Sequence, residues 1–256
     1  CALSQMAQTG DGRIRSTTFF TTQVDFSEAG DLTVFTDEYQ IKNLERTMHK
    51  RGYLDASEMA TTFNMLRAND LIWTFVVNNY LLGRAPAAFD LLYWNNDSTR
   101  MPLAMHSFYL REMYLNNRLA EPGGITLNGL PVDLAKVRIP IFLQSSKEDH
   151  IAPYPSVYKA TRLYSGPITF MLAGSGHIAG VINPPKANKY YYCTNNDVPD
   201  DVEDWIESSE RHEGSWWPYW HQWLYRRSGR KVPARIPGSG KLPAIEDAPG
   251  RYVSMK

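Results

Sequence analysis

Two short apolar segments, each ending in polar and turn-forming residues, constrain the fold of this chain more than any other feature. Segments 139–144 and 168–172 are apolar and β-rich, which predicts buried strands. Residues 154–164 between them have the spacing of a helix. The order strand, helix, strand indicates a parallel sheet with a crossover helix. The polar residues 145–150 and 174–177 would then lie together at the carboxyl ends of the strands, where functional sites collect in such sheets.

The rest of the chain completes an expected α/β architecture. Residues 2–8 have helical spacing, and residues 14–24 indicate a strand buried on both faces, because apolar and polar residues do not alternate cleanly there. A long helical region follows, with helix-like spacing in segments 37–50, 56–67, 70–82 and 101–119. It is too long for an ordinary loop in a compact domain. We predict a core of residues 1–25 and 133–256, interrupted by a helical insertion of residues 26–132.

The composition argues against several classes of function. Hydrophobic residues make up 43% of the 256 residues, which suffices for a sizeable core. The formal net charge is +0, without the basic excess of a nucleic-acid-binding protein. The most apolar stretches, such as residues 71–77, are far shorter than the roughly 20 residues of a membrane span. One basic cluster near the C-terminus fits a solvated tail better than a binding patch: Arg226, Arg227, Arg230 and Lys231.

The cysteines and the first residues bear on location and completeness. Cys1 and Cys193 are too few for a disulfide framework, so we expect a protein of the reducing cytoplasm. A charged region followed by an apolar stretch would predict a signal peptide, and the N-terminal residues do not have this pattern. Residues 1–7 have the pattern of the middle of an amphipathic helix, with no capping residue before it. We therefore expect the chain to be a fragment of a longer protein.

Asp149 and His177 are the main candidates for catalysis. Each directly follows one of two consecutive predicted strands, and Asp before His is their order in the α/β-hydrolase triad. An Asp in this place can hold an imidazole in one tautomer, although Asp149 alone fits a turn residue that caps the next helix. Small residues at 174–176 let the backbone turn sharply and present His177 to a cleft. A single loop His usually has no such role, but the pair favours catalysis.

Other candidate residues carry less weight. No Gly-x-Ser-x-Gly or Gly-x-Cys-x-Gly elbow occurs, so we expect the nucleophile upstream of Cys1. His150, beside Asp149, invites a metal site, but no ligand pattern accompanies it, and we predict none. The aromatic run 216–225 fits a carbohydrate site, an interface or core packing. Core packing is favoured by the helical spacing of its tryptophans: Trp216, Trp220 and Trp223.

Several segments have a recognisable sequence. The longest surround the two candidates, at residues 146–153 (SKEDHIAP) and 174–185 (GSGHIAGVINPP). Three shorter ones are residues 89–95 (FDLLYWN), 214–218 (GSWWP) and 248–253 (APGRYV). Together these segments resemble class I polyhydroxyalkanoate synthases, in the C-terminal part of the catalytic domain. The resemblance covers essentially the whole chain, and the segment around His177 is highly specific.

The resemblance implies a fold and a reaction. The fold is an α/β hydrolase with a helical cap, and the reaction polymerises (R)-3-hydroxyacyl-coenzyme A, usually the 3-hydroxybutyryl thioester, with release of coenzyme A. The nucleophile is the Cys of a Gly-x-Cys-x-Gly-Gly box upstream of this chain, and Cys1 does not match that box. His177 would activate the attacking groups, and Asp149 would orient His177. Coenzyme A is then part of the substrate and a product, so no cofactor is expected, and the fragment alone would be inactive.

Partners and alternatives also follow from the resemblance. It implies a homodimer formed through the cap and a place in the cytoplasm at the surface of polymer granules. An esterase or thioesterase of the same fold is the first alternative, distinguished by the identity of the nucleophile. A non-catalytic module on the polymer granule is the second, and it would bind granules without turnover.

Overall fold

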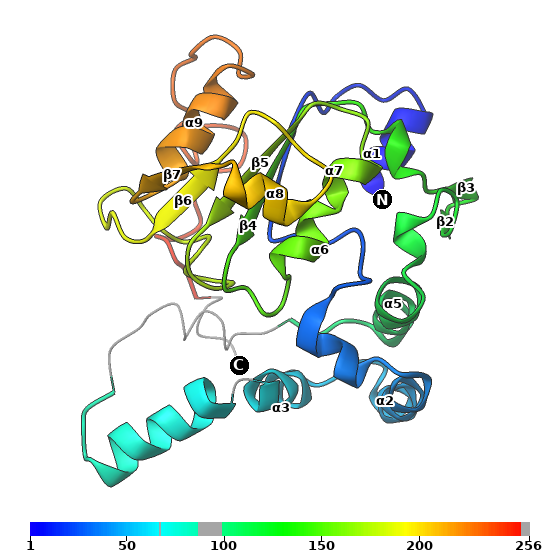
Figure 1. The fold of residues 1–256 in the computed structure, drawn as a ribbon, viewed down its shortest axis with the longest axis vertical. Helices are drawn as coiled ribbons and strands as arrows, with labels where there is room; N and C mark the ends of the chain where they lie inside the picture. The colour runs from blue at the N-terminus through cyan, green and yellow to red at the C-terminus, as the bar shows by residue number, and fades with distance from the viewer. Residues whose placement is uncertain (67, 87–98, 252–256) are drawn as a thin grey trace. The chain divides into compact units, whose positions relative to one another are not determined.

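A mixed five-stranded sheet positions the two candidate residues (Figure 1). Its strands, in spatial order, are β1 Thr17–Phe20, β4 Ile141–Ser146, β5 Ile168–Ala173, β6 Tyr191–Thr194 and β7 Glu210–Glu213. The first three run parallel, whereas β6 and β7 are antiparallel to their neighbours. The predicted parallel arrangement is confirmed for β1, β4 and β5, and the fold belongs to the α/β class.

The computed structural model describes residues 1–66, 68–86 and 99–251. The chain forms two compact units, Cys1–Trp220 and His221–Lys256. The predicted limits of the helical insertion both fall inside the first unit, and this division stays a prediction. Two of the recognisable segments are affected by the described range: residues 89–95 lie outside it, as do the last two residues of 248–253.

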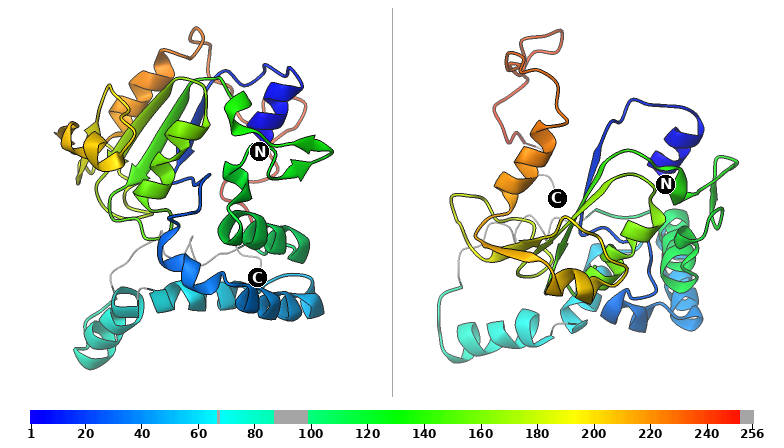
Figure 2. Two further views of the ribbon diagram at one scale, coloured as in Figure 1. Left: turned by 45° about the vertical axis from the view of Figure 1, so that its right-hand side comes forward. Right: turned by 45° about the horizontal axis from the view of Figure 1, so that its top comes forward.

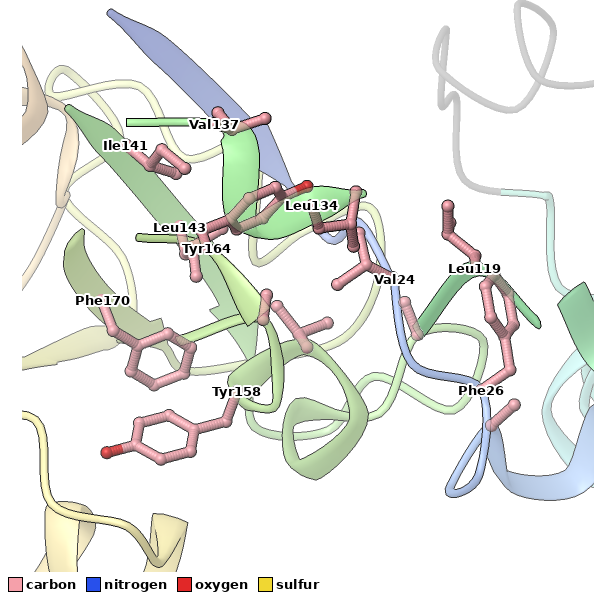
Figure 3. Close-up of a cluster of buried hydrophobic side chains, with 14 of the residues drawn as sticks. Val24, Phe26, Leu119, Leu134, Val137, Ile141, Leu143, Tyr158, Tyr164 and Phe170 are labelled. Carbon is pink, nitrogen blue, oxygen red and sulfur yellow. The ribbon is translucent and has the colours of Figure 1, made fainter. Parts of the chain in front are cut away.

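The core of the first unit forms around β4. All six residues of β4 are buried, as expected for a parallel strand covered on both faces. The crossover between β4 and β5 contains α6 Tyr154–Tyr158 and α7 Ala160–Leu163. Tyr158 meets Phe170 of β5 edge to face, with ring centroids 4.9 Å apart. Figure 3 shows how side chains from the strands and the crossover gather in one apolar cluster.

The strands β6 and β7 correct the expectation for the region after Pro185. The Tyr- and Asn-rich composition there predicts a loop containing Cys193. Cys193 instead lies buried in β6, opposite Leu172 of β5. Four-residue strands with half-exposed or exposed side chains leave only a weak periodic signal. Ladder bonds between β5 and β6, and between β6 and β7, decide their conformation. The predicted strand 14–24 is likewise shorter, because pairing with β4 is confined to β1.

The region between β1 and β4 is mainly helical, as predicted, although most of its helices are short and they are of several types. Its elements are η1 Gly30–Phe35, α2 Glu38–Arg51, α3 Ala56–Leu66, η2 Asn69–Trp73, η3 Val76–Leu81, α5 Leu103–Phe108, η4 Tyr109–Leu115, η5 Arg118–Ala120 and η6 Leu134–Lys136, with a hairpin of β2 Thr126–Leu127 and β3 Leu130–Pro131. Figure 2 shows α2 and α5 side by side, and they are in contact. The segments η2, η3 and η4 are π-helical turns, which depart from the regular spacing expected for 70–82 and 101–119.

One ion-pair network joins α2 to the α5–η4 segment. The guanidinium of Arg111 donates to Glu45 at 2.8 and 2.9 Å and to Glu38 at 2.8 Å. Ser107 also donates to Glu45. The bond from Arg111, ahead of the other contacts, lowers the pKa of Glu45 to about 2. This network therefore stabilises the helical layer only while its carboxylates are ionised.

Large apolar side chains elsewhere in the helical layer face solvent. Trp73, Tyr80 and Leu81 keep 57%, 84% and 73% of their surface exposed. Monomeric proteins rarely expose several large apolar side chains in one segment, and such exposure is typical of a contact surface. None of the helices in the described part of the chain has both the length and the apolar character required to cross a membrane.

Three helices flank the sheet segments in the sequence: α1 Ala2–Gln8, α8 Val202–Glu207 and α9 Trp217–Tyr225. The bounds of α1 match the helix predicted for residues 2–8. Trp216, directly before α9, is 1% exposed and Trp223 is buried, whereas Trp220 is half-buried. Core packing is thus confirmed for Trp216 and Trp223.

Candidate active site

Asp149 lies in the loop that follows β4, and its carboxylate serves two partners. Its Oδ1 accepts hydrogen bonds from the backbone N–H groups of Ile151 and Ala152, both at 2.9 Å. Its Oδ2 lies 2.8 Å from Nδ1 of His177. Of the two interpretations of Asp149 from the sequence, the partner of His177 agrees with this geometry. The helix cap does not, because the N-cap of α6 is Pro153, without a side-chain cap, and Asp149 binds the turn before it. One oxygen fixes the loop, and the other faces the imidazole.

The pairing of Asp149 with His177 defines the state of the imidazole. The Asp149 side chain is 0% exposed, while that of His177 is 32% exposed. Because a carboxylate can only accept, Nδ1 of His177 carries the proton in this bond, and in the neutral imidazole Nε2 then has the lone pair. The predicted proximity of the two residues is confirmed. The arrangement can accept a proton at Nε2 and stabilise the resulting imidazolium through the buried carboxylate.

Backbone hydrogen bonds tie together the two loops that carry the pair. The last paired residues of the two strands, Ser146 and Ala173, stand opposite each other in the register. Beyond them, the N–H of Lys147 donates to the carbonyl of Ala173 at 2.8 Å, and the N–H of Glu148 donates to that of Ser175 at 3.0 Å. The sheet ladder is thereby prolonged into the loops, so both side chains are fixed relative to one backbone framework.

The loop after β5 turns through an unusual backbone conformation. Ser175 has a φ of 76°, in the left-handed region that residues with a Cβ rarely adopt. Strain of this kind persists only where the surrounding structure enforces it, and it clusters at functional sites. The turn sends the chain back over the end of β4. Gly180 then packs so closely that a Cβ there would lie 2.1 Å from Oγ of Ser146.

A cavity of about 340 Å³ lies within the helical layer. Its largely apolar lining includes Phe35, Met59, Phe63, His106 and Tyr114. Nδ1 of His106 is buried and makes no hydrogen bond to the described residues, and burial lowers the pKa of this imidazole. Burial, together with the neighbouring Tyr109 and the charge of Asp149, raises the pKa of Tyr114.

The thiols and the candidate metal ligands lie elsewhere. Cys1 is exposed at the start of α1, and Cys193 is buried in β6. Within the described ranges, neither thiol is hydrogen-bonded to His177. The described residues also contain no group of three or more His, Cys, Asp or Glu side chains that could hold a metal ion. The structure therefore adds no further ligand to the adjacent Asp149 and His150.

One part of the site could not be predicted from the sequence. The spacing of the tryptophans predicts that Trp216 is buried, but it does not show where the indole N–H points. In the structure, Trp216 and Trp217 donate these groups to the loop that carries His177. The only available signal was that residues 214–218 and 174–185 both resemble the same family.

The fold and the site define a class: an α/β protein in which a buried Asp binds a half-exposed His beyond the ends of neighbouring parallel strands. Comparison with known proteins adds the family, although no family model matches the chain. A poly(3-hydroxyalkanoate) polymerase of Methylorubrum extorquens is 55% identical over 99% of this chain and 42% of its own length. Poly(3-hydroxyalkanoate) polymerase subunits PhaC of Rhizobium meliloti and Cupriavidus necator are 54% and 44% identical, over 99% and 100% of this chain.

These similarities extend over essentially the whole chain. The chain belongs to the poly(3-hydroxyalkanoate) polymerase family, as the recognisable segments predict. It spans about two fifths of the length of these relatives, since it covers 42%, 41% and 44% of them.

Proposed function

We propose that this chain supplies the base and its orienting carboxylate to a polymerase that makes polyhydroxyalkanoate from (R)-3-hydroxyacyl-coenzyme A. The observation that carries the proposal is the 2.8 Å contact between Nδ1 of His177 and Oδ2 of Asp149 in a chain of this family. The names of the relatives support the product class. The 3-hydroxybutyryl thioester is the substrate that we expect.

The first half-reaction transfers an acyl group to a cysteine. Nε2 of His177 takes the proton of the thiol, and the thiolate attacks the thioester carbonyl. The carbon–sulfur bond to coenzyme A breaks, and the proton passes from Nε2 to the departing thiolate, so coenzyme A leaves as a thiol. Asp149 holds Nδ1–H throughout and stabilises the transient imidazolium.

The second half-reaction makes the ester bond. Nε2 of His177 takes the proton of a 3-hydroxyl group, whose oxygen attacks the acyl–cysteine carbonyl. A carbon–oxygen bond forms, the carbon–sulfur bond breaks, and the cysteine recovers its proton from His177. We propose that this cysteine comes from a part of the protein outside the present sequence. Cys193 is buried within a strand, and Leu3 stands where the elbow pattern requires a glycine two residues after Cys1.

The helical layer supports a role in shielding the acyl–cysteine from water. Its cavity of about 340 Å³ has a largely apolar lining that suits a short acyl chain. We propose that the layer acts as the cap of an α/β-hydrolase fold. The exposed Trp73, Tyr80 and Leu81 support a homodimer formed through this layer. A cytoplasmic place at polymer granules completes the proposal.

The test uses the full-length protein that contains this chain, supplied with 3-hydroxybutyryl-coenzyme A. Free thiol release and polymer formation are followed together. His177→Ala should lower both by roughly 10³-fold or more, because the base is lost. His221→Ala, at an exposed position outside the site, should leave both unchanged. Near-normal coenzyme A release by His177→Ala would reject the mechanism. Release of coenzyme A and free 3-hydroxybutyrate without polymer would instead identify a thioesterase.

A further inference from the structure

His177 begins a short helical turn whose last carbonyl groups need partners. The N–H of Gly180 donates to the carbonyl of Gly176 at 2.8 Å, and that of Ile182 donates to Ile178 at 2.8 Å. In any helical turn, the final carbonyls have no partner further along the helix. Gly180 is buried, so its carbonyl cannot rely on bulk water.

Two adjacent tryptophans fill this need. The indole N–H of Trp216 donates to the carbonyl of Gly180 at 2.8 Å, and that of Trp217 donates to the carbonyl of Val181 at 2.9 Å. The hydroxyl of Ser215 donates to the carbonyl of Asn183, two residues beyond Val181, at 2.5 Å. Three consecutive side chains thus bind the end of the turn that His177 begins. We call residues 215–217 the indole clamp.

The indole clamp is anchored on the strand that leads to Asp149. Trp216 is 1% exposed, and its ring stacks on that of Phe142 in β4, with centroids 6.4 Å apart. It also packs against Phe20 of β1, at 5.6 Å. The loop of His177 is therefore held by a side chain lodged on β4, seven residues before Asp149 in the sequence. The clamp and the carboxylate share one rigid support.

We propose that Trp216 and Trp217 are positioning residues. By binding the carbonyl groups at the end of the turn that His177 begins, they keep the imidazole in hydrogen-bonding position against the Asp149 carboxylate. Neither residue needs to touch the substrate. The importance of this alignment for turnover rests on the function proposed above. The alignment of the imidazole with the carboxylate does not depend on that function. A change in the clamp should therefore alter the state of His177 even where no reaction is under way.

The experiment compares three single substitutions in the full-length protein: Trp216→Phe, Trp217→Phe and Trp220→Phe. Each removes one indole N–H and keeps an aromatic ring. Trp220 is the matched control, because its N–H donates to Oγ1 of Thr18 in β1, at 3.0 Å, and not to the turn. Protein labelled with ¹⁵N-histidine reports the tautomer of His177, whose signals are identified by their loss in His177→Ala.

We expect one fixed Nδ1–H tautomer in the unaltered protein and in Trp220→Phe. Trp216→Phe and Trp217→Phe should show a mixture of tautomers or a broadened Nδ1–H signal. Their kcat for coenzyme A release should fall about tenfold with KM within about twofold, as expected for a misplaced base. Trp217 is only half-buried, so Trp217→Phe keeps the test decisive should Trp216→Phe fail to fold.

Two results would overturn the inference. One is an unchanged His177 signal in a folded Trp217→Phe protein, and the other is an equal change in all three variants. An unaltered protein with the expected His177 signals and clamp response, but without polymer formation, would count against the proposed function alone.

Discussion

The loops at the strand ends and the helical layer are held by different forces. Backbone hydrogen bonds join the loops that follow β4 and β5. A buried carboxylate also fixes the first loop, and indole donors fix the second. In the helical layer, α2 and the α5–η4 segment are joined by an exposed or half-exposed ion-pair network around Arg111. Several large apolar side chains there have no cover.

We therefore expect substitutions in the two regions to affect different properties, namely the geometry of the candidate site and the stability of the helical layer. A loop that is fixed by many independent bonds keeps its shape when one bond is lost, so the first effect of a change there should be on the chemistry. Where a titratable ion-pair network joins two helices, the first effect of a change in it should be on stability. The following substitutions test that division, in order of decreasing effect.

The largest contrast is expected between two substitutions of Asp149. In Asp149→Asn, the amide oxygen can still accept from Ile151 and Ala152, but the amide N–H₂ faces His177 and favours the wrong tautomer. Activity of the full-length protein should fall by roughly 10²–10⁴-fold, with stability changed by less than about 1 kcal/mol.

Asp149→Ala should lose the same activity and in addition about 2–3 kcal/mol of stability, because two buried N–H groups lose their acceptor. Coenzyme A release and denaturant unfolding measure the two effects. Equal loss of stability in both variants would show that the loop is not held by Oδ1.

Gly180→Ala should disturb the same region through packing. The new methyl group would lie 2.1 Å from Oγ of Ser146 and 2.7 Å from the carbonyl oxygen of Gly176, so the turn must shift. We expect a loss of about 1–3 kcal/mol in unfolding free energy, together with reduced activity. Gly176→Ala is the control, since its nearest neighbour would be 3.6 Å away. A stable, active Gly180→Ala protein would mean that the loop is less constrained than these distances imply.

The smallest effect is expected in the helical layer, and it depends on pH. The folded-state pKa of Glu45, about 2, lies below its ordinary value of 4.5, so its stabilising effect is present above pH 4.5 and is lost as the pH falls toward 2. Glu45→Gln should cost about 1–2 kcal/mol near neutral pH, and this difference should shrink below pH 4.5.

The control for this prediction is Glu58→Gln, whose carboxylate lies 3.8 Å from Arg51 at an exposed position. Its effect should stay below about 0.5 kcal/mol at every pH. Thermal unfolding of both variants between pH 3 and pH 7 provides the measurement. A difference for Glu45→Gln that is constant across this range would remove the ion-pair network as its cause.

The sequence predicted those parts of the molecule that depend on local patterns. Helix α2 follows its prediction within one residue, and the Asp149–His177 pair was predicted because each residue directly follows a strand. The strands β6 and β7 were missed, because their conformation depends on the pairing of β6 with the edge of β5 and of β7 with β6. The indole clamp was also missed, since burial of an aromatic ring does not reveal the direction of its N–H.

The antiparallel pair β6–β7 has a consequence for local opening of the sheet. Because β6 covers the edge of β5, and β1 covers that of β4, both strands that lead to the Asp149–His177 pair have a neighbour on each side. Fraying begins at the margins of a sheet, where ladder bonds face water. In the described sheet, the pair is therefore separated from such fluctuations by β1 on one side and by β6 and β7 on the other. Amide hydrogens of β4 and β5 should exchange with solvent more slowly than those of β1 or β7.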